Sequence, residues 1–274
     1  MLRYEFRKYI HKSYFKIIAV WIVLVLIGLY SLKNVKLILE LSKLIDSSDK
    51  ITMNDYILGV FNSFQFVMTF IFPILFSILV SDLIISDYRE AHINMIFTRV
   101  NSIFIYVIKK CIFICILAVA FTLSLILILL GIAFFMDLSF SGKSNHYVYL
   151  YFNFINKSYT YIYLHTIAMF LIGLIFIGLL TILISVYTKN SAISVGLIVL
   201  IGYVHNVFYI LSSKWISVLP FSQYIVGVHK ELYPFGIPLS YFTQKFSITY
   251  MLVGSIFIVI LILRKLKKLQ GVIK

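Results

Sequence analysis

The sequence has little charge, little cysteine and little proline for its length. Asp, Glu, Lys and Arg make up 12% of the 274 residues, whereas 62% are hydrophobic and only four are proline. A soluble domain of this size would need far more polar surface, so the composition is that of a helical membrane protein. The two cysteines, Cys111 and Cys115, lie within an apolar run, where they are interpreted as small buried residues and not as a disulfide framework.

Several catalytic and nucleotide-binding motifs are also missing. The sequence contains no G-x-x-x-x-G-K-[ST] phosphate-binding loop, no H-E-x-x-H metal motif and no G-x-S-x-G nucleophile motif. We therefore expect no catalytic residue, no metal site and no cofactor bound by this chain. Any energy from ATP would have to come from another subunit.

Apolar runs near the length that crosses a bilayer recur along the whole chain. A helix needs roughly 20 apolar residues to cross about 30 Å of hydrocarbon, and a backbone in lipid must satisfy its own hydrogen bonds. No internal repeat divides the chain, so the sequence predicts one domain, residues 1–274, with six transmembrane helices. The six runs are Ile17 to Leu32, Tyr56 to Val80, Cys111 to Met136, Tyr161 to Tyr187, Ala192 to Leu211 and Phe246 to Leu263.

The distribution of basic residues predicts how these spans are oriented. An even number of spans places both termini on one side, and that side with its loops carries fifteen of the 24 lysine and arginine residues. The positive-inside rule then predicts cytoplasmic termini. The formal net charge of +14 divides into +11 inside and +3 outside, so the basicity follows from topology and needs no nucleic acid to explain it.

The first sixteen residues form an amphipathic pattern ahead of the first run. The segment 1–16 predicts an interfacial elbow helix lying on the inner leaflet. A basic flank that only sets orientation is the alternative. The apolar face of the pattern comprises Leu2, Phe6, Tyr9 and Ile10, and the basic side comprises Arg3, Arg7, Lys8, His11 and Lys12.

The segment 212–245, between the fifth and sixth runs, is too apolar for a free loop. Pro220, Pro234, Gly236 and Pro238 prevent one continuous helix there. We expect short half-helices that re-enter the membrane from outside. Backbone of this kind is tolerated only where protein or a water-filled cavity shields it, so the segment should pack against other spans.

A few polar residues fall at membrane depth. Such residues are functional hypotheses by default, and here they would line a transport path. Interhelical hydrogen bonding is the alternative explanation. The acidic residues fall at span ends, which disfavours a proton-driven mechanism. The polar residues in question are Asn62, Gln65, His165, His205 and Asn206.

The inner segment 81–110 combines a charged cluster with an apolar stripe. The cluster consists of Asp87, Arg89 and Glu90, and the stripe of Ile93, Ile96 and Phe97; Arg99, Lys109 and Lys110 follow. This pattern predicts an amphipathic helix presented to a cytoplasmic partner. A solvated loop is the alternative.

The inner segment resembles the corresponding region of the permease subunits of type-2 ATP-binding-cassette (ABC) exporters. Asp87, Arg89 and Glu90 stand at the family's charged cluster, Ile93 to Phe97 at its apolar turn, Arg99 near its arginine and Lys110 at its lysine. Ala91 and His92 occupy the place of the family's glycine, which is a departure from the pattern. The resemblance extends to the six spans, the elbow helix, the short inner loop Tyr187 to Ser191 and the outer segment around Pro220.

The resemblance implies a function and a set of partners. The inner segment would be a coupling helix that docks on one of two cytoplasmic ATPase subunits, which would hold the ATP and magnesium. A second permease, identical or homologous, would complete the substrate path in a bacterial cytoplasmic membrane. The exported substrate would be an amphipathic or antimicrobial peptide, a drug or a lipid-like molecule. Two alternatives are an ion-coupled secondary transporter and a non-transporting membrane anchor or sensor that recruits a cytoplasmic partner.

Overall fold

Long helices dominate the computed structural model, which describes residues 2–41, 51–63, 67–89, 102–139, 159–211, 214–229 and 241–273. Three short turns of π- or 3-10-helix, η1 (Val67–Ile71), η3 (Lys214–Val218) and η4 (Val226–Val228), connect them. Within these ranges the only β-type pairing is a single bridge between Thr52 and Ser139. The α-helices are α1 (Leu2–Leu41), α2 (Met53–Phe61), α3 (Phe72–Val80), α4 (Ile85–Arg89), α6 (Ile103–Phe135), α8 (Tyr159–Thr188), α9 (Ser191–Ile210) and α10 (Gln244–Ile273).

Six helical stretches of the described chain are long and apolar enough to cross a membrane. This confirms the predicted fold class at its coarser level, an all-α membrane protein with six spans. The stretches are Phe6–Leu37, Val67–Asp87, Ile103–Phe135, Thr160–Thr188, Ser191–Phe208 and Gln244–Leu269.

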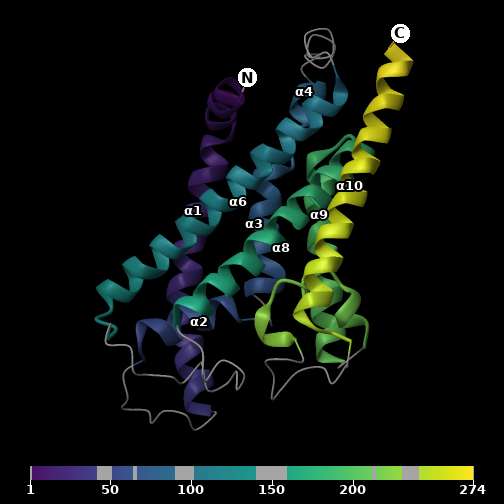
Figure 1. The fold of residues 1–274 in the computed structure, drawn as a ribbon. Coiled ribbons are helices and arrows are strands. Elements are labelled where there is room, and N and C mark those ends of the chain that lie inside the picture. The colour runs from purple at the N-terminus through teal and green to yellow at the C-terminus, as the bar shows by residue number, and fades with distance from the viewer. Residues whose placement is uncertain are drawn as a thin grey trace.

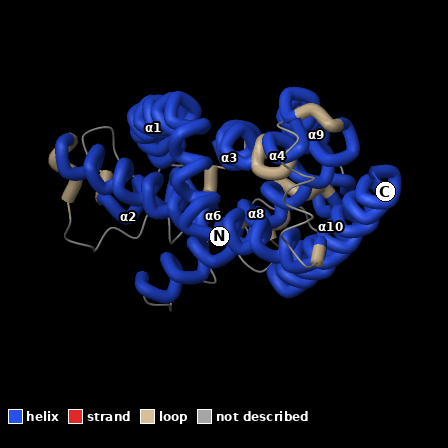
Figure 2. Tube along the Cα trace, turned by 90° about the horizontal axis from the view of Figure 1, so that it is seen from above, coloured by secondary structure: helices blue, strands red, loops and turns tan. Residues whose placement is uncertain are grey.

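The helices α3 and α8 lie at the centre of the bundle. Figure 2, which looks down on the bundle, shows α1 on one side of them and α9 and α10 on the other. Aromatic rings fill the core between these helices: Phe72 of α3 meets Phe121 of α6 and Phe170 of α8 edge to face, at centroid distances of 6.2 and 5.7 Å. The central spans are accordingly buried, whereas α1, α9 and α10 expose mostly apolar side chains.

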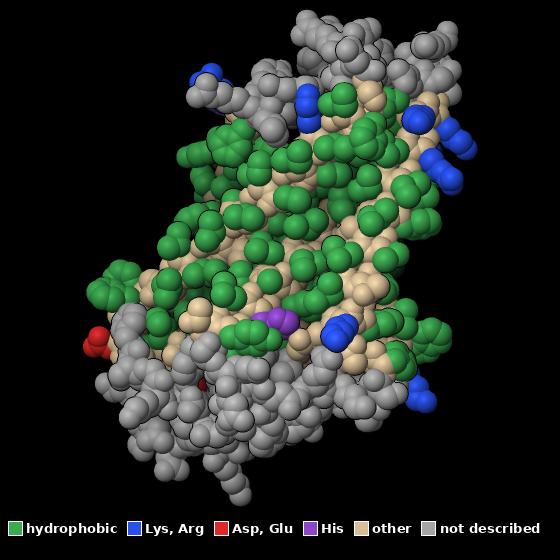
Figure 3. Space-filling view, viewed as in Figure 1, with side chains coloured by type: hydrophobic (Ala, Val, Ile, Leu, Met, Phe, Trp, Pro, Cys, Tyr) green, Lys and Arg blue, Asp and Glu red, His purple; other side chains and the backbone are tan. Residues whose placement is uncertain are grey.

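Both ends of the chain lie at the same end of the bundle, as an even number of spans requires (Figure 1). We call this the terminal end. Figure 3 shows lysine and arginine side chains near the two ends of the visible face and hydrophobic side chains across the middle. A tight turn between Thr188 and Ser191, in which Lys189 has a φ of 55°, returns the chain from α8 to α9 at the terminal end.

The first helix does not break where the sequence predicted. Instead of an elbow at residues 1–16 and a separate span, α1 is one 40-residue helix from Leu2 to Leu41. No glycine or proline interrupts the sequence before Gly28, so nothing in the backbone stops the helix at residue 16. The elbow residues therefore form the first turns of a helix that continues as a span.

The second span is interrupted, whereas the sequence predicted one run from Tyr56 to Val80. Helix α2 ends at Phe61, and the chain resumes as the π-turn η1 and then α3. The side chain of Asn62 donates a hydrogen bond of 2.9 Å to the carbonyl of Leu58 at the end of α2. Pro73 lies in the first turn of α3, where a missing N–H is tolerated.

Residues 214–229, the longer of the two described parts of the outer segment, pack against the spans at the end opposite the termini. Phe221 and Tyr224 are buried, and the hydroxyl of Tyr224 donates to the carbonyl of Met68 in η1. A side chain added at Gly173 of α8 would overlap the ring of Tyr224, so glycine is what permits this close approach. Re-entry of the segment into the membrane stays a prediction.

Candidate functional site

A buried carboxylate, Asp87, joins three helices at the terminal end. Its Oδ1 lies 2.7 Å from Nζ of Lys8 in α1. Its Oδ2 lies 2.8 Å from Nζ of Lys110 and accepts a hydrogen bond of 2.9 Å from the hydroxyl of Tyr106, both in α6. We call Asp87, Lys8, Lys110 and Tyr106 the carboxylate clamp. It fixes the start of α4 against α1 and α6 at once.

Local backbone geometry places Asp87 in this position. After α3 the chain continues through a turn at residues 81–84, where Ser81 N donates to Ser77 O at 2.9 Å. Asp87 N then donates to Ile84 O at 3.1 Å. The helical course thus continues from α3 into α4, which places Asp87 at the end of the span and between α1 and α6.

A second ion pair on the same helix face strengthens this connection. Lys16 of α1 pairs with Asp82 of the turn after α3, and both side chains are about one-third exposed (36% and 35%). Lys8 and Lys16 are eight residues apart, about 12 Å along α1, and each reaches an aspartate that follows α3. Two lysines of one helix therefore hold two aspartates of the next span.

Among the described residues, the clamp brings two ammonium groups to one carboxylate. The Asp87 and Lys110 side chains are 1% and 5% exposed, and Lys8 is 16% exposed, so two ammonium groups share one carboxylate. The Lys110 ammonium also lies 5.4 Å from the centre of the Tyr106 ring, where the π face attracts a cation. Breaking a buried pair by removing one partner is strongly destabilising, because the remaining charge has no counter-charge. Asp87 is thus the residue that connects the other members of the clamp.

The clamp brackets the inner segment on both sides. Asp87 stands just before residues 90–101, and Tyr106 and Lys110 stand just after them. Because these side chains bond to one another, the two flanks of the inner segment are fixed together.

The predicted coupling residues are only partly within the described structure. Asp87 is buried and bonded to Lys110, and its predicted role in coupling to a partner stays a prediction. Arg89 ends α4, but its side chain lies outside the described residues. The remaining predicted coupling residues, Glu90, Ile93, Ile96, Phe97 and Arg99, also lie outside them.

The predicted elbow residues pack on α6. The rings of Phe6 and Tyr9 meet Phe113 edge to face at 6.4 and 5.3 Å. The hydroxyl of Tyr9 donates a hydrogen bond of 3.0 Å to the carbonyl of Leu79 at the end of α3. Ile10 is 38% exposed, and the side chain of Leu2 lies outside the described residues. The start of α1 is thus a packed helix end, beside the clamp.

Two of the polar residues predicted to line a path make hydrogen bonds between elements. Oδ1 of Asn62 accepts from Gly227 N of η4 at 3.2 Å. Oδ1 of Asn206 in α9 accepts from Thr69 Oγ1 of η1 at 3.2 Å, while its Nδ2 donates to Gly202 O at 2.9 Å. These contacts agree with the structural alternative, interhelical hydrogen bonding across the interruption of the second span.

The two predicted histidines differ in their surroundings. The ring of His165 stacks on Tyr161 of its own helix, with centroids 5.9 Å apart and an interplanar angle of 6°. His205 of α9 is buried near the ring of Phe221, and its Nδ1 has no hydrogen-bond partner within the described residues. Gln65 lies outside the described residues. Among the described polar residues, Asn62 and His205 thus contact the outer segment, whereas Asn206 bonds to η1 and to its own helix.

The sequence contains a weak signal for the clamp that is separate from the resemblance to ABC permeases. Lys8, Lys12 and Lys16 recur every four residues before the first predicted span. Asp82 and Asp87 follow the second predicted span, on the same predicted inner side. A helical row of lysines opposite two acids indicates pairing between the elements. In contrast, among the described residues no cluster of three or more His, Cys, Asp or Glu is arranged to hold a metal ion.

Comparison with known proteins gives a family but no activity. The model of a family described as "Protein of unknown function (DUF2705)" matches residues 20–270. No curated protein matches the chain. No solved structure matches it either.

Proposed function

The chain belongs to the DUF2705 family, and from its own architecture we propose that it is the permease subunit of an ABC exporter. In this proposal it forms part of a substrate path through a bacterial cytoplasmic membrane with both termini in the cytoplasm. Two separate ATPase subunits hydrolyse the ATP. A second permease, identical or homologous, completes the path.

The carboxylate clamp is the observation that carries the proposal. A loop that only connects two spans does not need a buried ion pair, which is expensive to desolvate, at the point where it leaves the membrane. Here Asp87 on one flank of the inner segment is bonded to Tyr106 and Lys110 on the other flank. Such an arrangement would keep the two flanks of the inner segment together when a partner moves the segment.

The mechanism follows from these connections. ATP binding would draw the two ATPase subunits together, and each would move an inner segment docked in its surface. Because the clamp fixes both flanks of that segment to Lys8 of α1, the movement would pass to α1, α3 and α6 as a rigid-body displacement. The inner segment would act as the coupling helix, with Arg89, Glu90 and the Ile93, Ile96 and Phe97 stripe as its contact residues.

The outer segment would close the opposite end of the path. Its residues 221–229 are buried, with Tyr224 bonded to η1, and we propose that the segment re-enters the membrane from outside. Exposed apolar side chains of α9 and α10, such as Leu200, Tyr203 and Phe257, offer surface for the second permease and for lipid. An amphipathic peptide, a drug or a lipid-like molecule is the substrate class that fits such an apolar path.

A membrane anchor that recruits a cytoplasmic partner is the second candidate. It is favoured by the bonding of Asn62 and Asn206, whose amide groups are engaged within the protein and have no need of a transported ligand. An anchor would bind its partner without coupling ATP hydrolysis to transport.

Purification of the tagged chain from its native membrane tests the proposal. An ABC ATPase should co-purify, and the complex should hydrolyse ATP in proteoliposomes, whereas the chain alone should not. Hydrolysis by the partner-free chain, or the absence of any co-purifying ATPase, would overturn the proposal. A co-purifying partner of another class would support the anchor.

A further inference from the structure

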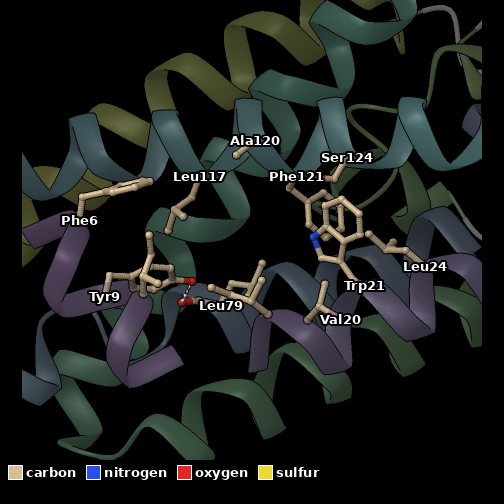
Figure 4. Close-up of a pocket in the computed structure, with 12 residues that line it drawn as sticks. Phe6, Tyr9, Val20, Trp21, Leu24, Leu79, Leu117, Ala120, Phe121 and Ser124 are labelled. Atoms are coloured by element: carbon tan, nitrogen blue, oxygen red, sulfur yellow. Dashed lines mark hydrogen bonds between the residues drawn. The ribbon is translucent and has the colours of Figure 1, made fainter. Parts of the chain in front are cut away.

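An apolar groove runs between α1 and α6, on the membrane side of the carboxylate clamp. Figure 4 shows its lining residues, with Phe6 near one end and Trp21 near the other, and Leu79 of α3 among them. The groove has a volume of about 200 Å³. Phe6 and Trp21 remain 47% and 45% exposed, so the groove is open along the surface of the bundle.

The surroundings of the groove determine what kind of group can fill it. The exposed residues of α1 beside it, Ile18, Ile22 and Val25 among them, are apolar, as on a surface that faces hydrocarbon. An empty groove would deprive its lining atoms of dispersion contacts. A lipid acyl chain is the group that a membrane supplies at this depth.

Charge at the terminal end of the groove favours one class of lipid. Arg7 is exposed and follows Phe6 directly in α1, next to the face on which Phe6 and Ile10 line the groove. Among the described side chains at this end, positive charge exceeds negative charge. The cations are Arg7, Lys8, Lys12, Lys16, Lys109 and Lys110, and the carboxylates are Asp82 and Asp87.

We propose that this groove binds one acyl chain of an anionic phospholipid whose headgroup lies at Arg7. The excess positive charge attracts the headgroup, and the apolar walls hold the chain. Because the groove lies between α1 and α6, its occupant holds these helices together beside the clamp. The proposal does not depend on transport, so it can fail or hold independently of the ABC assignment.

Fluorescence of Trp21 provides the test. The chain has two tryptophans, so a Trp215→Phe variant leaves Trp21 as the only one. This variant is placed in vesicles of dioleoyl lipids in which either phosphatidylglycerol or phosphatidylcholine carries brominated chains, which quench a nearby indole. The quenching should give an apparent affinity of the groove for phosphatidylglycerol about fivefold higher than for phosphatidylcholine at equal mole fraction. This is the factor expected from one nearby basic side chain.

Two variants with matched controls make the result specific. Arg7→Gln should remove the preference, whereas His11→Gln, on the neighbouring exposed face, should retain it. Ala120→Phe fills the groove and should reduce quenching by phosphatidylglycerol, whereas Val119→Phe, which is next in sequence but does not line the groove, should not. Native mass spectrometry of the unmodified protein should show retained phosphatidylglycerol.

Equal quenching by the two brominated lipids would overturn the proposal, because the groove would then hold only bulk lipid. A preference that survives Arg7→Gln would also contradict it, since the headgroup would lie elsewhere. Circular dichroism of each variant checks that the helices are intact. A loss of quenching is interpreted only for variants that pass this check.

Discussion

Lys8 and Asp87, 79 residues apart in the sequence, form an ion pair of 2.7 Å that joins the first turns of α1 to α4. The pair is one half of a clamp whose other half, Lys110 with Tyr106, belongs to α6. The inner segment leaves and returns at this clamp.

Asp87→Asn should lower the free energy of unfolding by about 3 kcal/mol, because it removes the carboxylate charge that Lys8 and Lys110 share in a buried site. Unfolding in mixed detergent micelles, followed by circular dichroism, measures the change. Asp82→Asn is the matched control: its pair with Lys16 is about one-third exposed, and such pairs contribute about 1 kcal/mol or less. Equal effects of the two substitutions would show that Asp87 is not the residue that connects the clamp.

A double-mutant cycle separates the charge effect from general damage. Lys110→Met combined with Asp87→Asn should be less destabilising than the sum of the single changes, since removing the cation relieves the unpaired charge. Additive effects would mean that Asp87 and Lys110 do not interact.

Gly173→Ala should destabilise the protein by about 1 to 3 kcal/mol, the usual cost of overpacking a filled core, because the new methyl group would overlap the ring of Tyr224. Gly196→Ala is the control, since no atom lies within 4 Å of a side chain added there and alanine favours a helix. Thermal unfolding should show a lower melting temperature for Gly173→Ala and an unchanged or higher one for Gly196→Ala. A neutral Gly173→Ala would show that the outer segment does not pack on α8.

Tyr224→Phe should lower the free energy of unfolding by about 1 to 3 kcal/mol. The buried carbonyl of Met68 in η1 would lose its hydrogen bond from the Tyr224 hydroxyl. Burial also raises the pKa of Tyr224, so the hydroxyl remains a donor throughout the accessible pH range. Tyr203→Phe, at a position 62% exposed on α9, should have little effect. Matching stabilities of the two variants would contradict the contact.

Labelling of single cysteines with an impermeant maleimide tests orientation, in a chain whose Cys111 and Cys115 are replaced by alanine. Lys214→Cys, exposed in η3, should react from outside intact cells, whereas Ser102→Cys should react only after permeabilisation. Ser222→Cys should react poorly in both conditions, because Ser222 is fully buried. Outside labelling at Ser102 would invert the topology and place the inner segment where there is no ATP.

The spans were predictable because their signal is local. Runs such as Tyr161 to Tyr187 and Ala192 to Leu211 agree within two residues with α8 and α9, since hydrocarbon thickness sets the length of a helix. The helix end predicted at residue 16 was wrong because a change from polar to apolar residues does not by itself break a backbone. The interruption after Phe61 was missed because π-turns depend on tertiary contacts such as the one between Tyr224 and Met68.

The clamp was less predictable than the spans. The motif comparison singled out Asp87 for its charge, but its role depends on Lys8 and Tyr106, whose proximity is a property of the folded bundle. For Asn62 and Asn206 the sequence indicated hydrogen bonding between helices but not the partners. Those partners, Gly227 and Thr69, come from distant parts of the chain. Pairings across tens of residues carry no periodic signal in a single sequence.

Photocrosslinking from the inner segment tests most directly the claim that it docks on an ATPase. Benzoylphenylalanine placed at Ile96, on the predicted apolar stripe, should capture an ABC ATPase on irradiation of intact membranes, as identified by mass spectrometry. The same residue at Ile105, exposed on α6 just after the segment, should not capture it. Capture at Ile96 that is lost in Arg89→Glu/Glu90→Arg is the predicted result, and no ATPase at Ile96 with correctly inserted protein would contradict the account.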